Sequence, residues 1–508
     1  MKKTKQEKIR VVCGASFLKI YDIDDDRRDK IWNYFKFVDD KKKNSPAYRN
    51  RPYMDVHYRA LDRRSNIIGI GFLDYLLAFI ETNKWDYEVE DTREYDKTFT
   101  EDYFDNINWK KLFNIEPRDY QIDAVKTCLI ERSGLVASRT GSGKSLMMAM
   151  TARLLDEPTL ILFDKTDLVH QTYKEFIRVG FSPKELAQVQ GANNKPARFT
   201  FATIQSKGKV YDFIELFKAV IIDEAHGIRA EGYQELLTVF KGNWRFGFSA
   251  TPLSMENAAE KAKVIRFIGR IIHQGEDTNA LVEQGVLAKP KIFFIKCDRA
   301  ADETVVWENS GRDYHALYRQ EIVENEYRNA LVAKICAKRK TKKVVVLYEI
   351  VDHGEELVKS LNKLLPGREI FLLSGKDDVK IRRKAVEDFE KSENAVIIAS
   401  RIFDQGVDIK SVNVVVNTGA GKGFIKAVQR LGRGLRKVDG KDSVEYFDIL
   451  DENSRVLERQ AKRRIAIYKK EGHVVETIEP EQLKWLIILK NGYYGRCMRV
   501  INGFTTDA

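Results

Sequence analysis

A glycine-rich loop that carries a lysine and a hydroxyl, SRTGSGKS at 138–145, has the residue types that bind phosphate. It follows an apolar run and opens a helical pattern, which is the context that a phosphate loop requires. Lys144 is expected to reach the terminal phosphates of a nucleotide and the Ser145 hydroxyl to hold Mg²⁺, while backbone N–H groups cradle the β-phosphate. The nucleotide contacts predicted in this loop are Thr140, Gly141, Ser142, Gly143, Lys144 and Ser145.

Two adjacent carboxylates, Asp223 and Glu224 of a DEAH segment, end a second apolar run. At the carboxyl end of a strand, Asp223 can hold Mg²⁺ through water, and Glu224 can polarise the water that attacks ATP. His226 lies two residues further along. We expect His226 to couple this site to Ser249 and Thr251 of a following SAT segment, which would relay the state of the nucleotide.

The segment PRDYQ lies shortly before the glycine-rich loop. Here Arg118 and Gln121 are predicted to contact the nucleotide, with Gln121 placed to recognise the adenine. The segment is a weak signal alone, and its position before the loop strengthens it.

A cluster of positive charge in the second half of the chain, QRLGRGLR at 429–436, can complete the site. Arg433 and Arg436 are three residues apart on a predicted helix, so they share a face. In GTPases, an arginine at the γ-phosphate raises the rate by about 10³–10⁵. Because Lys144 lies in the first half of the chain, hydrolysis would require two halves to close on ATP. Gln429 is predicted to take part in the same coupling.

The chain around these motifs alternates apolar strands with helical segments, the pattern of a parallel α/β sheet. The first expected strands are 134–138, 159–163, 199–203, 219–223 and 245–249. The pattern restarts after Pro290, with expected strands at 291–296, 343–348, 369–374, 395–400, 413–418 and 444–449. Two sheets of similar size predict two tandem α/β domains joined by a hinge at 279–291.

The N-terminal part differs from the rest in charge. Residues 1–64 carry 18 Lys/Arg against 10 Asp/Glu, a net charge of +8, and residues 65–117 carry 5 against 12, a net charge of −7. This distribution predicts a small module with one face for nucleic acid, then a solvated linker around 91–106. A helix over 69–83 is expected to pack on a small sheet in this module.

Composition limits the class of protein. The net charge of +12 favours a polyanionic partner. The five cysteines lie far apart without a C-x-x-C pair, which indicates reduced thiols. We expect no membrane span, since no apolar stretch of about 20 residues is present, and no signal peptide. A cytoplasmic protein is predicted, in the host cytoplasm if the chain is viral, and nothing requires a ring, so we expect a monomer.

The order of these motifs resembles superfamily 2 helicases and translocases over roughly residues 115–450. The resemblance implies two RecA-like domains that use ATP and Mg²⁺ to move on nucleic acid. It places Gly406 and Asp408 near the ribose of ATP. It also implies that one tracking strand is held by hydroxyls and backbone amides, here Lys165, Thr166, Gly191, Thr203, Gln205, Ser374 and Ser400.

Within this superfamily the chain is most similar to the phage UvsW-type helicases, which remodel branched recombination and replication intermediates. Residues 34–81 carry an aromatic pair, a basic P-x-Y/F-R segment and an apolar GFLD helix, as in that family's N-terminal module. Where relatives carry W-D-G, this chain has Met54, Asp55 and Val56, so the local turn stays open. The expected domains are an N-terminal nucleic-acid-binding module at 1–105, RecA-like domains at 106–285 and 286–470, and a C-terminal extension of unassigned role at 471–508.

The resemblance favours an ATP-driven DNA helicase that acts on forks, four-way junctions or displaced-strand loops, with RNA possible in a hybrid. An RNA helicase of the DEAH type is an alternative, although the C-terminal part is short for one. The motor subunit of a restriction or repair complex is another, without a nuclease constellation to support it. An ATP-independent annealing or scaffolding protein is a third, which the lysine, carboxylates and arginines of the site argue against.

Overall fold

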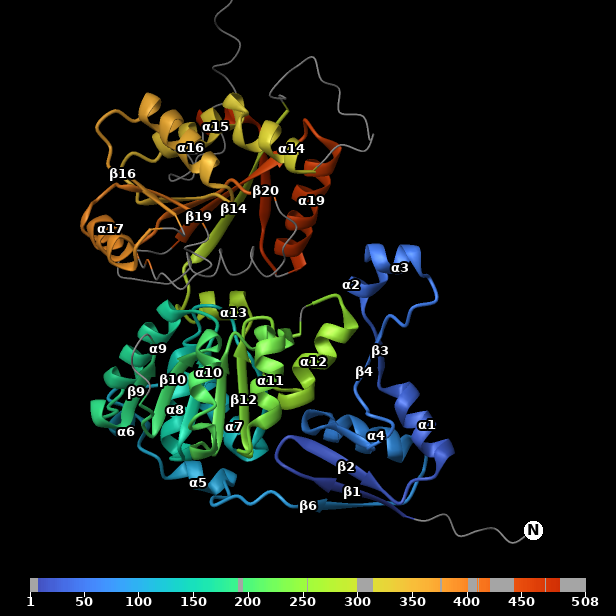
Figure 1. Ribbon diagram of the computed structural model, residues 1–508. Coiled ribbons are helices and arrows are strands. Elements are labelled where there is room, and N and C mark those ends of the chain that lie inside the picture. The colour runs from blue at the N-terminus through green and yellow to red at the C-terminus, as the bar shows by residue number, and fades with distance from the viewer. Residues whose placement is uncertain are drawn as a thin grey trace, which may run out of the picture. The chain divides into compact units, whose positions relative to one another are not determined.

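The computed structural model divides into two compact units, Met1–Asp277 and Thr278–Ala508, each with a parallel sheet covered by helices (Figure 1). No described helix is long and apolar enough to cross a membrane. The structure describes residues 8–190, 195–253, 255–298, 314–374, 377–400, 409, 411–420, 443–470 and 472–484.

The parallel sheet of the first unit has seven strands in the order β13-β7-β12-β11-β8-β10-β9. Its inner strands are mostly apolar because helices cover both faces of a parallel sheet, and every residue of β8 and β11 is buried. The strands are β7 (Ser133–Ala137), β8 (Thr159–Phe163), β9 (Leu186–Val189), β10 (Phe199–Thr203), β11 (Ala219–Asp223), β12 (Trp244–Ser249) and β13 (Ile271–Gln274).

Both edge strands of this sheet, β9 and β13, were absent from the sequence prediction. Each has four residues and carries polar side chains, so neither shows the continuous apolar run of a central strand. The helices around the sheet are α7 (Asp119–Glu131), α8 (Lys144–Leu155), α9 (Thr166–Arg178), α10 (Lys207–Val210), α11 (Glu231–Val239) and α12 (Ala258–Ile268).

The second unit contains another seven-stranded parallel sheet, in the order β16-β17-β15-β18-β19-β14-β20. Two such sheets confirm the predicted tandem α/β architecture. The strands are β14 (Lys289–Cys297), β15 (Val344–Leu347), β16 (Ile370–Leu373), β17 (Val396–Ala399), β18 (Val414–Asn417), β19 (Ser443–Asp451) and β20 (Val475–Ile478). The helices are α13 (Thr278–Glu283), α14 (Tyr314–Tyr318), α15 (Glu326–Ala337), α16 (Val351–Leu364), α17 (Val379–Lys391) and α19 (Arg455–Lys470).

Strand β20 lies beyond residue 470, where the second domain was expected to end. It pairs in parallel with β14, with Ile292 opposite Val475 and Ile295 opposite Ile478. The second sheet therefore takes one strand from the segment to which the sequence assigned no role.

The N-terminal module is an α+β structure within the first unit. Its four-stranded sheet has the order β5-β2-β1-β6, and Leu76 and Ile80 of α4 lie in the same apolar core as the inward side chains of β1, as the helix prediction expected. The elements are β1 (Ile9–Cys13), β2 (Phe17–Tyr21), α1 (Asp25–Tyr34), β5 (Ile67–Gly69), α4 (Leu73–Thr82) and β6 (Tyr87–Asp91).

A two-stranded arm, formed by β3 (Lys36–Val38) and β4 (His57–Arg59), leaves this module and carries two short helices between its strands, α2 (Asp40–Lys43) and α3 (Pro46–Asn50) (Figure 1). Asp55 orders the turn that the sequence left open. Its carboxylate accepts from the backbone N–H of His57 at 3.0 Å, and hydrogen bonds from His57 lower the pKa of Asp55 to about 2. The turn forms here without the W-D-G sequence of relatives.

The segment 91–106 is not a solvated linker, and this expectation was wrong. Phe99 and Phe104 are buried, and the rings of Tyr95 and Phe99 pack edge-on against Trp244 at the start of β12. Aromatic residues among the acidic ones explain the difference, because they bury apolar area against the sheet domain. The segment ends in α5 (Glu101–Asp105), and α6 (Trp109–Phe113) follows.

Candidate ATP site and nucleic-acid contacts

The strand order of the first sheet brings the predicted ATP motifs together. The glycine-rich loop, the SAT segment and the DEAH segment follow β7, β12 and β11, which are neighbours in the sheet. Because all three strands are parallel, their carboxyl ends meet at one edge, where ligands bind in such sheets. Motifs that are far apart in the sequence therefore lie close together in the structure.

The loop before α8 fits the phosphate group of a nucleotide. Gly141 and Gly143 have φ angles of 89° and 91°, a conformation that favours glycine. Gly143 is the N-cap of α8 and no side chain caps this helix, so its first N–H groups face an anion site. The Thr140 hydroxyl is buried and has no hydrogen-bond partner within the part of the chain that the structure describes, which also suits a polar ligand.

Lys144 lies between the loop and the carboxylate of Glu224. Its Nζ donates to the carbonyl oxygen of Ser138 at 3.4 Å and lies 4.0 Å from Oε1 of Glu224. Both side chains are largely buried, so the pair is shielded from water. Ser145 follows in the first turn of α8 and Asp223 ends β11, where it is buried.

The predicted coupling residues form a connected group around Glu224. Oε2 of Glu224 lies 3.3 Å from both Nδ1 of His226 and Oγ of Ser249, and Nδ1 of His226 lies 3.2 Å from Oγ of Ser249. The backbone N–H of Thr251 donates to Oγ of Ser249 at 3.2 Å. Glu224 itself has a left-handed backbone, φ 50° and ψ 53°, which costs a non-glycine residue about 1–3 kcal/mol and is found at functional sites.

Two tyrosines near this group were absent from the prediction. The Tyr120 hydroxyl donates to the carbonyl oxygen of Ser142 at 2.8 Å. The Tyr233 hydroxyl is buried and has no hydrogen-bond partner among the described residues, and burial, with the nearby carboxylates of Asp164, Asp223 and Glu224, raises the pKa of Tyr233 well above its usual range. Tyr120 lies within the PRDYQ segment but was not singled out there, and Tyr233 lies in no recognisable motif, so only the fold identifies their positions.

Gln121 contacts the loop itself. Its side-chain amide donates to the carbonyl oxygen of Ser142 at 2.8 Å and accepts from the backbone N–H of Arg118 at 3.0 Å. The Gln121 side chain is buried and that of Arg118 is exposed. Gln121 therefore holds the phosphate loop in this structure, and its recognition of adenine stays a prediction.

Magnesium fits this edge of the sheet together with a nucleotide. The described residues contain no group of three or more His, Cys, Asp or Glu side chains placed to hold a metal alone. Mg²⁺ is commonly bound by one or two protein groups plus substrate phosphates and water. Ser145 and Asp223 match that arrangement.

The predicted strand contacts of the first unit follow β8 and β10, at the same edge as the ATP motifs. Lys165 is the N-cap of α9 and Thr166 its first residue. Thr203 ends β10, where Oγ1 lies 3.2 Å from Oγ of Ser206, and Gln205 is exposed in the turn that follows. These side chains lie toward the β9 side of the sheet, away from the glycine-rich loop.

In the second unit, Ser374 and Ser400 follow the neighbouring strands β16 and β17. The backbone N–H of Ser374 donates to Oδ2 of Asp377 at 2.6 Å, and that of Ser400 donates to the carbonyl oxygen of Leu373 at 3.1 Å.

The remaining predicted residues lie outside the described part of the chain: Gly191, Gly406, Asp408, Gln429, Arg433 and Arg436.

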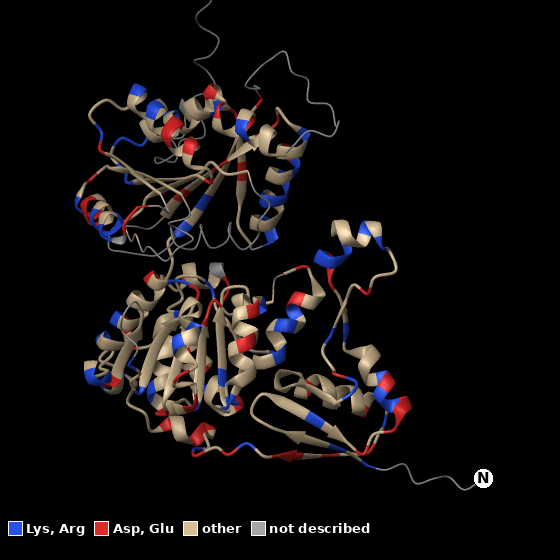
Figure 2. Cartoon of the chain, viewed as in Figure 1, with Lys and Arg blue, Asp and Glu red and all other residues tan. Residues whose placement is uncertain are grey.

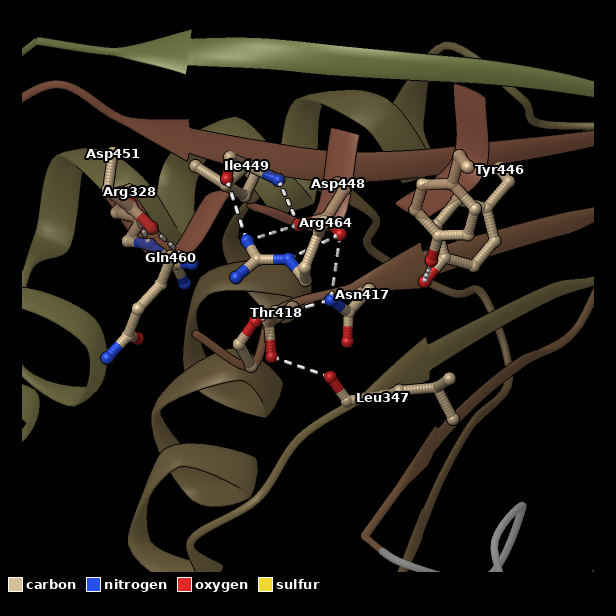
Figure 3. Close-up of polar contacts among 12 residues, drawn as sticks. Arg328, Leu347, Asn417, Thr418, Tyr446, Asp448, Ile449, Asp451, Gln460 and Arg464 are labelled. Carbon is tan, nitrogen blue, oxygen red and sulfur yellow. Dashed lines mark hydrogen bonds and ion pairs between the residues drawn. The ribbon is translucent and has the colours of Figure 1, made fainter. Parts of the chain in front are cut away.

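A buried polar network fixes the exit of β18, just before the segment that carries the predicted arginines (Figure 3). Asp448 accepts two hydrogen bonds from Arg464, at 2.9 and 3.0 Å, and one from Asn417 at 3.0 Å. The Asn417 amide also donates to the carbonyl oxygen of Gly419 at 3.2 Å. No sequence motif indicated this network.

Two protein-family models match the chain in the order of these domains: "Type III restriction enzyme, res subunit" over residues 114–254, and "Helicase conserved C-terminal domain" over residues 327–438. With the fold and the site, they define the class of the protein, an ATPase with the helicase core of superfamily 2. The predicted resemblance is confirmed.

Matches to individual relatives support this class of protein. The chain is 26% identical over 364 residues to the DNA 3'-5' translocase XPB2 of Sulfurisphaera tokodaii, a match that covers 64% of this chain and 80% of the relative. It is 24% identical over 447 residues to the ATP-dependent DNA helicase uvsW of Enterobacteria phage T4, covering 83% of this chain and 86% of the relative. A fragment of a putative HsdR subunit of a type I restriction enzyme from Vibrio vulnificus YJ016 shares the fold, with a TM-score of 0.53, 20% identity, and coverage of 72% of this chain and 69% of that one.

Proposed function

We propose that this chain is an ATP-driven DNA helicase or translocase that unwinds or branch-migrates forked, four-way or displaced-loop DNA. The proposal is carried by the group of residues around Glu224. Lys144, His226 and Ser249 each lie within 4.0 Å of the Glu224 carboxylate, beside a loop shaped for phosphate. ATP is the substrate that such a loop and carboxylate serve together.

The residues of the first unit supply half of the ATP chemistry. Lys144 binds the terminal phosphates, and Glu224 orients and polarises the attacking water. Ser145 and Asp223 would hold Mg²⁺, which would neutralise charge on the phosphate oxygens. Positive charge from Arg433 and Arg436 completes the site when the two domains close.

The SAT segment gives the ATP site a route to the rest of the motor. Ser249 contacts the Glu224 carboxylate and accepts from the backbone of Thr251. A change in the charge or position of Glu224 during hydrolysis therefore alters the hydrogen bonds of the segment between β12 and α12. That segment connects the nucleotide to the surface that holds the tracking strand.

DNA is proposed as the polymer because both curated relatives described above are named for action on DNA. The positive net charge of this chain supports a polyanionic partner, and the basic N-terminal module supports a contact beyond the tracking strand. We retain as proposals a monomeric state, a cytoplasmic location, and the domain limits 1–105, 106–285 and 286–470, the last extended to include β20.

The test is ATP turnover by the full chain, at one fixed salt concentration, with single-stranded DNA, linear duplex, a four-way DNA junction and single-stranded RNA. Lys144→Ala is the blank, and Lys174→Ala, which removes an exposed lysine of α9, is the matched control. Strongest stimulation by the junction, with ATP-dependent conversion to duplex arms, supports the proposal. Stimulation by RNA alone would overturn the choice of DNA.

A further inference from the structure

Tyr233 of α11 is a buried polar side chain to which the predicted ATP motifs give no role. Only 2% of the residue is exposed, and its ring lies in the same apolar core as Ile222 and Ile228. The hydroxyl has no hydrogen-bond partner within the part of the chain that the structure describes. Because nearly all buried polar groups in proteins are paired, this hydroxyl is a candidate for a hydrogen bond that forms in another state of the protein.

Three carboxylates at the carboxyl edge of the first sheet act on this hydroxyl. Strands β7, β8 and β10 carry no charged side chain, and β11 carries only Asp223, its last residue (Figure 2). Asp164 directly follows β8, and Glu224 directly follows β11. Burial raises the pKa of Tyr233 well above its usual range, and the three carboxylates raise it further, Asp164 most. The hydroxyl therefore keeps its proton and is a donor among possible acceptors.

Asp164 is the carboxylate best able to accept from Tyr233. The Glu224 carboxylate already lies 3.3 Å from two other side chains, and Asp223 is the proposed Mg²⁺ ligand. Asp164 is exposed, and its carboxylate forms no hydrogen bond or ion pair with another residue in the described ranges. It directly precedes the candidate nucleic-acid contacts at 165–166. A nucleic-acid strand bound there can therefore set the position of this carboxylate.

The 3₁₀ helix η5 (Ala225–Arg229) joins Tyr233 to the ATP site. It begins directly after Glu224, and α11 follows it after a single residue. Gly227 of η5 packs against the Tyr233 ring, since a Cβ at this glycine would lie 3.5 Å from Cε2 of the ring. A shift of Glu224 when ATP binds therefore moves the segment that positions Tyr233.

Helix α11 also contacts a second candidate nucleic-acid segment, the 3₁₀ helix η3 (Ile204–Ser206) that follows β10. Lys207, directly after η3, forms an ion pair with Glu235 of α11. Gln205 in η3 is one of the predicted contacts to the tracking strand. The helix therefore connects the turn that follows the ATP motif to a segment that is expected to hold nucleic acid.

We propose that Tyr233 is a positioning residue whose hydroxyl donates to the Asp164 carboxylate when ATP and a nucleic-acid strand are both bound. The hydrogen bond fixes the segment after β8 on the helix that follows the ATP motif. ATP and the nucleic acid then favour each other's binding, because each brings one partner of the hydrogen bond into place. This role rests on the proposed function, which supplies both ligands.

The affinity for single-stranded DNA, with and without a non-hydrolysable ATP analogue and Mg²⁺, tests this role. Fluorescence anisotropy of the full chain with a labelled strand gives both dissociation constants at one fixed salt concentration. Tyr233→Phe removes only the hydroxyl, so it should weaken binding in the presence of the analogue about 2- to 30-fold, the range for residues that modulate coupling. Binding without the analogue should stay near that of the wild type.

Tyr211→Phe is the matched control, because it removes an exposed tyrosine hydroxyl from the same unit, and it should match the wild type in both conditions. Equal affinities of Tyr233→Phe and the wild type with the analogue, or equal losses with and without it, would overturn the role. In chemical denaturation, Tyr233→Phe should be at least as stable as the wild type, since the hydroxyl that it removes has no partner in the free protein. A clear loss of stability would show that the hydroxyl is bonded in the free protein, which also contradicts the role.

A second substitution tests the acceptor. Asp164→Ala should weaken binding with the analogue, relative to binding without it, by about the same factor as Tyr233→Phe. The double variant should show no further loss, because either change alone already removes the hydrogen bond. Losses that multiply in the double variant would rule out the pair. A wild-type chain that neither binds single-stranded DNA nor responds to it in turnover would contradict the proposed function, and this role with it.

Discussion

Nη2 of Arg245 in β12 donates to Oγ of Ser16 in the β1–β2 turn at 2.7 Å, which joins the N-terminal module to the first parallel sheet. The guanidinium is fully buried and also donates to the carbonyl oxygens of Gly242 and Phe240, at 3.2 and 2.7 Å. No carboxylate pairs with it within the part of the chain that the structure describes, and burial lowers the pKa of Arg245 to about 9. The buried guanidinium of Arg245 therefore links the module to the sheet, and its hydrogen bonds offset the cost of burying its charge.

Ser16→Ala should destabilise the first unit. The substitution leaves a buried N–H of Arg245 without its acceptor, which costs about 1–3 kcal/mol. Chemical denaturation, followed in the first unit, measures the change. Thr238→Ala removes an exposed hydroxyl from α11 nearby and should leave stability nearly unchanged. Equal stability of Ser16→Ala and the wild type would contradict the role of this contact.

Lys144→Ala should abolish most ATP turnover while the fold is kept. Nζ contacts the phosphate loop and lies 4.0 Å from Oε1 of Glu224, and loss of one such preorganised charge lowers kcat about 10²-fold or more. Steady-state turnover with and without DNA measures it, with Lys174→Ala as control. A rate like that of the wild type would refute the site.

Arg433→Ala should spare ATP binding and reduce hydrolysis. An arginine that acts only on the transition state lowers kcat, by about 10³–10⁵ in the GTPase examples, without a matching loss of affinity for the ground state. Equilibrium binding of a fluorescent ATP analogue and single-turnover hydrolysis separate the two effects. Weakened binding with a normal single-turnover rate would remove the finger role.

Asp448→Asn should strongly destabilise the second unit. The change leaves Arg464, which is buried, without the carboxylate that accepts two of its hydrogen bonds, and breaking a buried ion pair costs about 3–5 kcal/mol. Asp352→Asn makes the same chemical change in an exposed pair with Arg319 and should cost less than about 1 kcal/mol. Denaturant midpoints measure the loss of stability in each variant. Equal losses in the two variants would contradict the role of the buried pair.

The second unit should lose stability in acid through His353. Its Nε2 donates to Oδ1 of Asn329 at 3.0 Å, and burial, with the charge of Arg328, lowers the pKa of His353 from 6.5 to about 3. Below pH 6.5 the unfolded chain binds a proton that the folded chain does not, so stability falls by up to about 1.4 kcal/mol per pH unit until pH 3 is approached.

Denaturation of the wild type and of His353→Gln at several pH values between 7 and 4 isolates this contribution. The stability difference between the two proteins should shrink or reverse as the pH falls. His315→Gln, which replaces an exposed histidine, should keep the pH dependence of the wild type. A difference between His353→Gln and the wild type that is constant with pH would contradict the assignment.

Strands with continuous apolar runs were predictable because burial on both faces demands such runs. The runs at 159–163, 199–203 and 219–223 form β8, β10 and β11 within the same limits. The edge strands β9, β13 and β20 were not predicted, since half-buried strands carry mixed side chains, whereas the edge strand β16 has an apolar run and was expected at 369–374. The prediction for the 91–106 segment was wrong for a related reason. Its acidic residues are exposed, but the rings of Tyr95 and Phe99 pack against Trp244.

The sequence by itself determined the two-sheet architecture, the ATP motifs and their chemistry, because residues that are close in the chain encode a glycine-rich loop before a helix or carboxylates after a strand. Only the tertiary structure decided which distant residues meet. Ser16 and Arg245, Asp39 and Asn257, and Asn417 and Arg464 around Asp448 are joined by packing of separate elements. No local pattern encodes such contacts, because they depend on the register and orientation that the whole core imposes on each side chain.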